Sequence, residues 1–265
     1  MLSLFQWTCL LSILAVTFAG GYFPLFHPDK VRDTQSIPFG EAFTSGVFLA
    51  LAATLMLPSS LLVLATSFPH FDYPLGAFIA IMAFMALLVL EHKVEHLRHL
   101  SATGEDERSS AIIPVIMTTM IAIPSFFLGT AFGASETDAA LLIFVAIMIH
   151  KSSAAFALAL IMVRSTMNRG QVWITFCMFA FATPLGILVG EQLHSWLGMG
   201  TMVIVKGIIL GLAAGTFLYM ATLHGFHHAP MITICGCRKG FSIMLAGFLL
   251  TTFVRLLLGE AHKIV

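Results

Sequence analysis

The chain consists of long apolar segments separated by short polar connections. Eight segments are candidate membrane spans, at about Leu4–Phe23, Ala42–Phe68, Leu75–His92, Ile112–Gly133, Ala139–Val163, Val172–Leu193, Met202–Thr222 and Phe241–Leu258. A helix needs about 20 apolar residues to cross the hydrocarbon core of a bilayer. The pattern therefore predicts an all-α membrane protein with eight transmembrane helices, in which residues 1–265 form a single integral membrane domain.

The composition agrees with this prediction and argues against several functions. Of the 265 residues, 58% are hydrophobic and 10% are charged, and the mean hydropathy is +0.97. Soluble domains, in contrast, carry about 25% charged residues. The sequence contains no nucleotide-binding loop, GxSxG turn or HExxH motif. We therefore expect no enzyme activity, no tightly bound cofactor and no nucleic-acid partner, with the lipid bilayer as the surroundings.

Basic residues are concentrated in alternate connections. They follow the first, third, fifth and seventh spans, as Lys30, Arg32, Lys93, Arg98, Arg108, Arg164, Arg169, Arg238 and Lys239. Connections rich in Lys and Arg face the cytoplasm, so both termini are expected on the extracellular or lumenal face. Arg255 and Lys263, near the C-terminus, disagree with this bias.

One hydrophilic stretch, residues 91–110, follows the third span. Its first half places His92, His96 and His99 on one helix face, because residues three and four apart are neighbours on a helix. Its second half contains a glycine and an acidic run, which indicates a short cytoplasmic loop at about 93–111. The three histidines could bind a metal ion, although a solvated helix end with mixed charges is the simpler interpretation.

Two basic residues, His150 and Lys151, lie near the middle of the fifth span. A basic residue at the bilayer centre costs roughly 2.5–3.5 kcal/mol on insertion scales, so it faces a polar cavity or a partner rather than lipid. Asp and Glu are almost absent from the spans, which leaves little material for a carboxylate proton relay. The pair therefore predicts a pathway through the membrane, with His150 as a candidate metal ligand.

A further group of histidines follows the seventh span. His224 and His228 share a helix face if that helix continues so far, and two imidazoles at this spacing can bind one zinc ion. Interfacial histidines that reach toward the headgroups are the alternative. Cys235 and Cys237 lie in the same connection, where a CxC pair of thiolates is a weak signal for a soft metal ion.

Six segments resemble, in the same order, parts of the ZIP (Zrt/Irt-like) family of divalent metal transporters, in particular its shorter eukaryotic branch. They are FTSGVFLALAATLMLP at 43–58, YPLGAFIAIMAFMALLVLEH at 73–92, IHKSSAAFALAL at 149–160, TPLGILVG at 183–190, GLAAGTFLYMA at 211–221 and KGFSIMLAGFLLTTF at 239–253. The resemblance implies eight helices with both ends outside and a variable cytoplasmic loop after the third. It also implies transport of zinc, or of iron or manganese, toward the cytoplasm through a site between the fourth and fifth spans.

The resemblance assigns roles to individual residues. It makes His150 the intramembrane ligand, and it places Lys151 where other branches use an acidic residue to hold a second ion, so a single-ion site would follow. The sequence departs from the family pattern at four positions where ligands are usual, Pro124 and Leu128 in the fourth span and Leu55 and Ser59 in the second. These departures remove most of the expected metal ligands.

The seventh span compensates in part. His224 and His228 align with the carboxylates of the family pattern, which implies a softer site at the cytoplasmic exit, and His92, His96 and His99 would sense or collect the released ion. The leading hypothesis is zinc transport by alternating access, at the plasma membrane on family grounds, and a homodimer is left open. The alternatives are a transport-inactive scaffold that acts as a metal-sensing or regulatory membrane partner, and transport of a different substrate.

Overall fold

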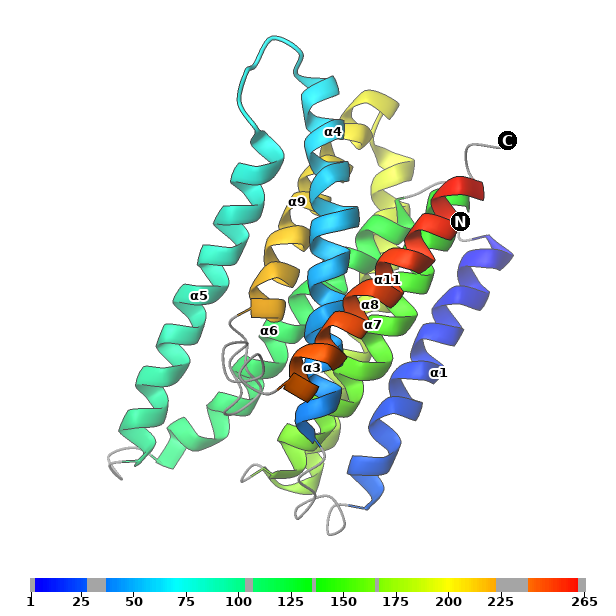
Figure 1. Cartoon of the computed structure of the whole chain (residues 1–265). Helices are drawn as coiled ribbons and strands as arrows, with labels where there is room; N and C mark the ends of the chain where they lie inside the picture. Colours follow the sequence, from blue (N-terminus) through cyan, green and yellow to red (C-terminus); the bar gives the residue numbers. More distant parts are fainter. Residues whose placement is uncertain are drawn as a thin grey trace.

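The described part of the protein is a bundle of long helices (Figure 1). A computed structural model describes residues 3–27, 37–102, 107–134, 137–164, 167–222 and 238–261. In chain order the helices are α1 (Leu4–Phe26), α3 (Ile37–Ala50), the π-helical η1 (Leu51–Met56), α4 (Leu57–Ser67), α5 (Leu75–Ala102), α6 (Glu107–Gly133), α7 (Thr137–Arg164), α8 (Arg169–Trp196), α9 (Met199–Thr222) and α11 (Arg238–Ala261). Each predicted span coincides with one of these helices or, for the second span, with α3, η1 and α4 in succession. The prediction of an all-α bundle is confirmed.

Six of the helical rods in the described ranges are long and apolar enough to cross a membrane. The other two, α6 and α7, carry shorter apolar runs at Thr118–Gly133 and Ile143–Phe156. The chain is therefore a multi-pass membrane protein. The beginning of α1 and the end of α11 lie at the same end of the bundle (Figure 1), as an even number of crossings requires.

Two helices begin at side-chain caps that the sequence specifies. Ser3 and Gln6 form a reciprocal capping box at the start of α1, and Asn168 and Gln171 form another at the start of α8. Such boxes satisfy N–H groups that have no partner within the helix. They fix where these two spans begin.

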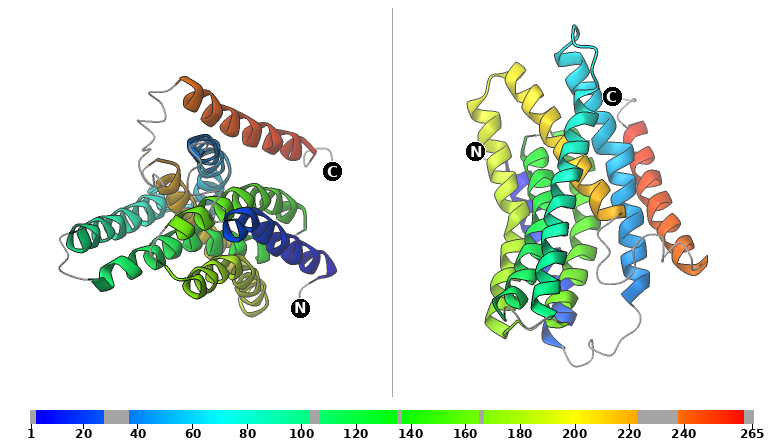
Figure 2. Two further views of the ribbon diagram at one scale, coloured as in Figure 1. Left: turned by 90° about the horizontal axis from the view of Figure 1, so that it is seen from below. Right: turned by 90° about the vertical axis from the view of Figure 1, so that its left-hand side faces the viewer.

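The helices sort into two groups by their contacts (Figure 2). The α6 group consists of α1, α6, α7 and α8, and the α9 group consists of α3, η1, α4, α5, α9 and α11. In the view from below, α11 lies on the opposite side of the bundle from α8 (Figure 2). The two groups meet where α6 contacts α9 and α5, and where α3 contacts α7.

Glycines bring helix backbones together within each group. A Cβ atom at Gly129 or Gly133 of α6 would overlap carbonyl oxygens of α8, and one at Gly186 or Gly190 of α8 would overlap carbonyl oxygens of α6. Small residues allow such close approach in membranes. The backbones of α6 and α8 therefore lie in direct contact at these four glycines.

The connection after α5 is shorter than the loop expected at about 93–111. The helix continues to Ala102, in agreement with the helical spacing of the histidines, and α6 already begins at Glu107. Residues 103–106 lie outside the described ranges. Lys, Glu, Arg and Leu dominate the start of this stretch and are good helix formers, so the helix extends beyond the apolar run.

The second span contains a joint that the sequence pattern does not reveal. Between α3 and α4, residues Leu51–Met56 form a π-helix, and the N–H of Leu57 bonds to the carbonyl of Ala52. The hydroxyl of Thr54 donates to the carbonyl of Ala50 at 2.6 Å. π-Helical turns are rare and frequently lie at functional sites. The π-helical turn separates α3 from α4 within this span, close to the candidate site described next.

Candidate functional site

The imidazole of His150 lies at the meeting of four helices. It is 2% exposed on α7, and its Nε2 atom lies 3.0 Å from the hydroxyl oxygen of Ser125 on α6. The ring centroids of Phe48 on α3 and Phe217 on α9 each lie 5.0 Å from the imidazole centroid. These four residues are called the His150 cluster. The expectation that His150 has a polar partner inside the bundle agrees with this geometry.

The Ser125 hydroxyl connects the cluster to neighbouring turns. Its oxygen is also placed to donate to the carbonyl of Ile121 at 3.2 Å, and the Ser125 carbonyl accepts from the hydroxyl of Thr183 on α8 at 3.2 Å. A hydroxyl has one proton to donate, so it serves either the carbonyl of Ile121 or Nε2 of His150 at one time. A metal ion at Nε2 requires that the imidazole first leave the Ser125 hydroxyl, since coordination uses the lone pair of that nitrogen.

The donor set around His150 is small. Among the described residues, no group of three or more His, Cys, Asp and Glu side chains could hold a metal ion. Leu128, at one of the departed ligand positions, is fully buried. A structural zinc site has about four protein ligands, so one imidazole and one hydroxyl can bind a dication only if water or further donors complete its coordination. Within the described residues, the cluster alone does not supply the ligands of a structural zinc site.

Lys151 faces a different neighbour from His150. Successive residues of an α-helix point about 100° apart, and the Lys151 side chain is fully buried against α8. Its Nζ atom donates to the carbonyl of Phe179 at 2.7 Å and lies 3.5 Å from the centroid of the Phe179 ring. The carbonyl and the ring both stabilise the positive charge. Lys151 thus joins α7 to α8 and brings no ligand to the His150 cluster.

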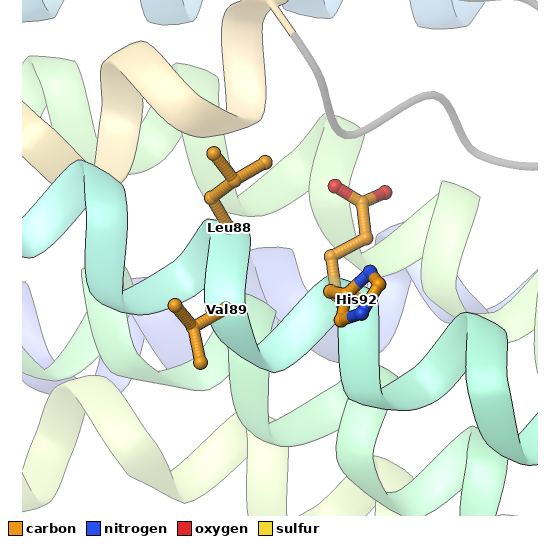
Figure 3. Close-up of a pocket in the computed structure, with 4 residues that line it drawn as sticks. Leu88, Val89 and His92 are labelled. Atoms are coloured by element: carbon orange, nitrogen blue, oxygen red, sulfur yellow. The ribbon is translucent and has the colours of Figure 1, made fainter.

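The other predicted site residues are not brought together by the described structure. His92 and His96 are exposed on α5, and His92 borders a pocket of about 600 Å³ with Leu88, Val89 and Glu91 (Figure 3). The side chain of His99 lies outside the described residues, as do His224, His228, Cys235 and Cys237. Their roles as metal ligands stay predictions.

A hydrogen bond that the sequence analysis missed joins α5 to α9. The hydroxyl of Tyr219, which is fully buried, donates to the carboxylate of Glu91. The Tyr219 ring packs edge-on against Phe84 with centroids 6.0 Å apart. A hydroxyl inside an apolar span needs a partner, and this was the signal available in the sequence. Glu91, at the end of an apolar run, was the acceptor to consider.

Replacing Tyr219 with phenylalanine is expected to lower the free energy of unfolding by about 1–2 kcal/mol, because a bond to a charged acceptor contributes more than the small average for interhelical bonds in membranes. The measurement is thermal unfolding of the purified protein in detergent. Tyr73→Phe is the matched control, since Tyr73 is 50% exposed. An equal loss in both variants would contradict the assigned role of the Tyr219–Glu91 bond.

Comparisons with known proteins point to one family. The family model described as ZIP zinc transporter matches residues 3–112 and 96–255. Zinc transporter ZIP9 of Xenopus tropicalis is 28% identical over 186 residues, which cover 62% of this chain and 59% of the relative. Zinc transporter ZIP1 of Takifugu rubripes is 25% identical over 291 residues, covering 89% of this chain and 95% of the relative. Protein zntD of Dictyostelium discoideum is 29% identical over 137 residues, covering 50% of this chain and 20% of the relative. The chain thus spans less than two thirds of the ZIP9 relative and almost all of the ZIP1 relative.

Proposed function

This chain belongs to the ZIP zinc transporter family, and from that membership we propose that it carries zinc across a membrane toward the cytoplasm by alternating access. The observation that carries the proposal is the imidazole of His150, buried at the meeting of the α6 and α9 groups and bonded to Ser125. Burying a polar ring inside a membrane bundle costs free energy, and such residues commonly mark a pathway for ions or substrates. The zinc ion is the transported substrate, and we propose no tightly bound cofactor and no enzyme activity.

The chemistry of the cluster favours zinc over hard cations. Imidazole nitrogen suits zinc and related transition metals, whereas calcium and magnesium prefer sets of oxygen ligands. With Leu128 and Pro124 at two family ligand positions, the site carries little negative charge. It should therefore bind the ion weakly and release it readily.

The cytoplasmic side of the path is proposed from the sequence. We assign His224 and His228 to the exit, and His92, His96 and His99 to collection of the released ion. The exposure of His92 and His96 on α5 is compatible with that role. We further propose, on family grounds, a plasma-membrane location. Both termini are proposed to lie outside, which the distribution of Lys and Arg supports.

Uptake of radiolabelled zinc by the purified protein in liposomes tests the proposal. The initial rate is expected to exceed that of protein-free liposomes, to saturate with zinc, and to fall with an excess of unlabelled cadmium but not of calcium. Cadmium shares the preference for nitrogen and sulfur ligands, and calcium does not. No uptake from protein whose folding has been verified would contradict transport and favour the transport-inactive scaffold.

A further inference from the structure

Three aromatic rings of the His150 cluster, those of Phe48, His150 and Phe217, pack against one another. The centroids of Phe48 and Phe217 are 5.3 Å apart, and each lies 5.0 Å from the imidazole of His150. The exposed fraction is 2% for Phe48, 2% for His150 and 0% for Phe217. The two phenylalanines therefore help to leave the imidazole almost no surface open to water, and a hydrated ion would have to pass the packed side chains to reach its nitrogen atoms.

This enclosure opposes the approach of an ion to His150. A dication loses part of its hydration when it reaches an apolar enclosure, and hydrophobic constrictions block ions by excluding water. The Phe48 and Phe217 rings pack edge-to-face, an arrangement that stabilises an aromatic pair beyond the burial of area, and both rings lie tilted against the imidazole. The enclosure is thus stable in this conformation and closed to solvent.

The three rings come from both helix groups. His150 is on α7 of the α6 group, whereas Phe48 and Phe217 are on α3 and α9 of the α9 group. A change in the contact between the groups therefore changes the spacing of these rings directly.

The span that carries Phe48 contains a helical joint, although Gly46 packs α3 against the backbone of α11 as closely as Gly215 packs α9 against α5. Phe48 lies three residues before η1, where the helical register changes, and Pro58 just beyond has no N–H to continue the ladder. Phe217 lies on α9, whose Gly211 and Gly215 bring it against α4 and α5 with no room for a side chain. A shift of α3 at the η1 joint would separate the Phe48 ring from the other two.

We propose that Phe48 and Phe217 form an aromatic gate that controls access of water and ions to His150. The proposal rests on the proposed function, because a gate has a role only if His150 meets a transported ion. In the conformation described here the gate is closed.

Labelling of a thiol at the cluster tests the gate without any need for transport. The parent protein carries His150→Cys, and the four native cysteines are replaced by alanine or serine. A positively charged, water-soluble methanethiosulfonate is added to this protein in liposomes, and the rate of modification is measured by mass spectrometry. Adding Phe48→Ala is expected to raise that rate by severalfold, up to about tenfold, because the contact of Phe48 with Phe217, which remains after His150→Cys has removed the imidazole, is lost.

Phe132→Ala is the matched control. Phe132 is also fully buried and contacts Phe5 and Phe144, but it lies seven residues beyond Ser125 on α6, which is about 10 Å along the helix axis. This variant makes a cavity of the same size and is expected to leave the labelling rate unchanged. An equal increase in both variants would show general loosening and overturn the gate.

A second variant keeps the test decisive if Phe48→Ala does not fold. Phe48→Leu keeps an apolar side chain at this position but loses the flat ring, and a hydrophobic replacement closer in size disturbs a packed core less than alanine does. It is expected to raise the labelling rate by a smaller factor. A rate equal to that of the parent would overturn the gate whatever the transport assays show. Absence of zinc uptake by the folded protein would instead overturn the proposed function and leave the labelling result intact.

Discussion

Replacing His150 with alanine is expected to reduce zinc uptake in liposomes to the level of protein-free liposomes. The substitution removes the imidazole together with its contacts to Ser125, Phe48 and Phe217. Loss of groups that only orient a metal ligand already costs about 10–100-fold in affinity or activity, and loss of a ligand itself should cost at least as much. Initial rates of radiolabelled zinc uptake give the measurement.

Two further variants make the His150 result specific. His70→Ala removes a histidine that is exposed in the connection between α4 and α5, and its uptake is expected to equal that of the unchanged protein. His150→Gln can keep a hydrogen bond to Ser125 but offers zinc an amide in place of an imidazole, so uptake should be lost while the fold is kept. Equal flux with and without the His150 imidazole would remove this residue from the transport mechanism.

Replacing Gly215 with alanine is expected to destabilise the bundle by about 1–3 kcal/mol or more, the range for overpacking of a filled interior. A Cβ atom at this position would overlap the carbonyl oxygen of Ala80 on α5, and a backbone atom cannot turn aside as a side chain can. Gly215 also lies one turn before Tyr219, so separation of the two helices would weaken the bond to Glu91. Thermal unfolding in detergent measures the loss.

Gly200→Ala is the control in the same helix. A Cβ atom at Gly200 would have no heavy atom within 4 Å, and alanine is favoured over glycine in a helix by up to about 1 kcal/mol. The midpoint of unfolding should stay unchanged or rise slightly. A similar loss at both positions would contradict the steric explanation for Gly215.

The fold could be predicted from the sequence to a large extent, because the bilayer requires each span to be a helix with about 20 apolar residues. Apolar length alone located all eight segments. The η1 joint could not be foreseen, since a π-helical turn of Leu, Ala, Thr and Met has the same apolar composition as the α-helix around it. Apolar length placed the end of the third span near His92, and only the helical spacing of the following histidines indicated that α5 continues beyond it.

The candidate site was predicted only at its centre. The cost of burying an imidazole pointed to His150, but nothing in the sequence distinguished Phe48 and Phe217 from the many phenylalanines that face outward, such as Phe78 and Phe253. Lys151 was grouped with His150 because the two are adjacent, and the helical rotation directs it toward Phe179 instead. Contacts between residues on different helices depend on how the helices pack, which local sequence patterns do not encode.

The glycine contact between α6 and α8 also bears on how the protein assembles. Glycine has no side-chain rotamers to lose, so these two helices can associate with little loss of conformational entropy. The intervening helix, α7, is held to α6 through His150 and to α8 through Lys151. The contacts that join these three consecutive helices, including the bond between His150 and Ser125, do not require α9 or α11, so the three helices can associate before the rest of the chain is inserted.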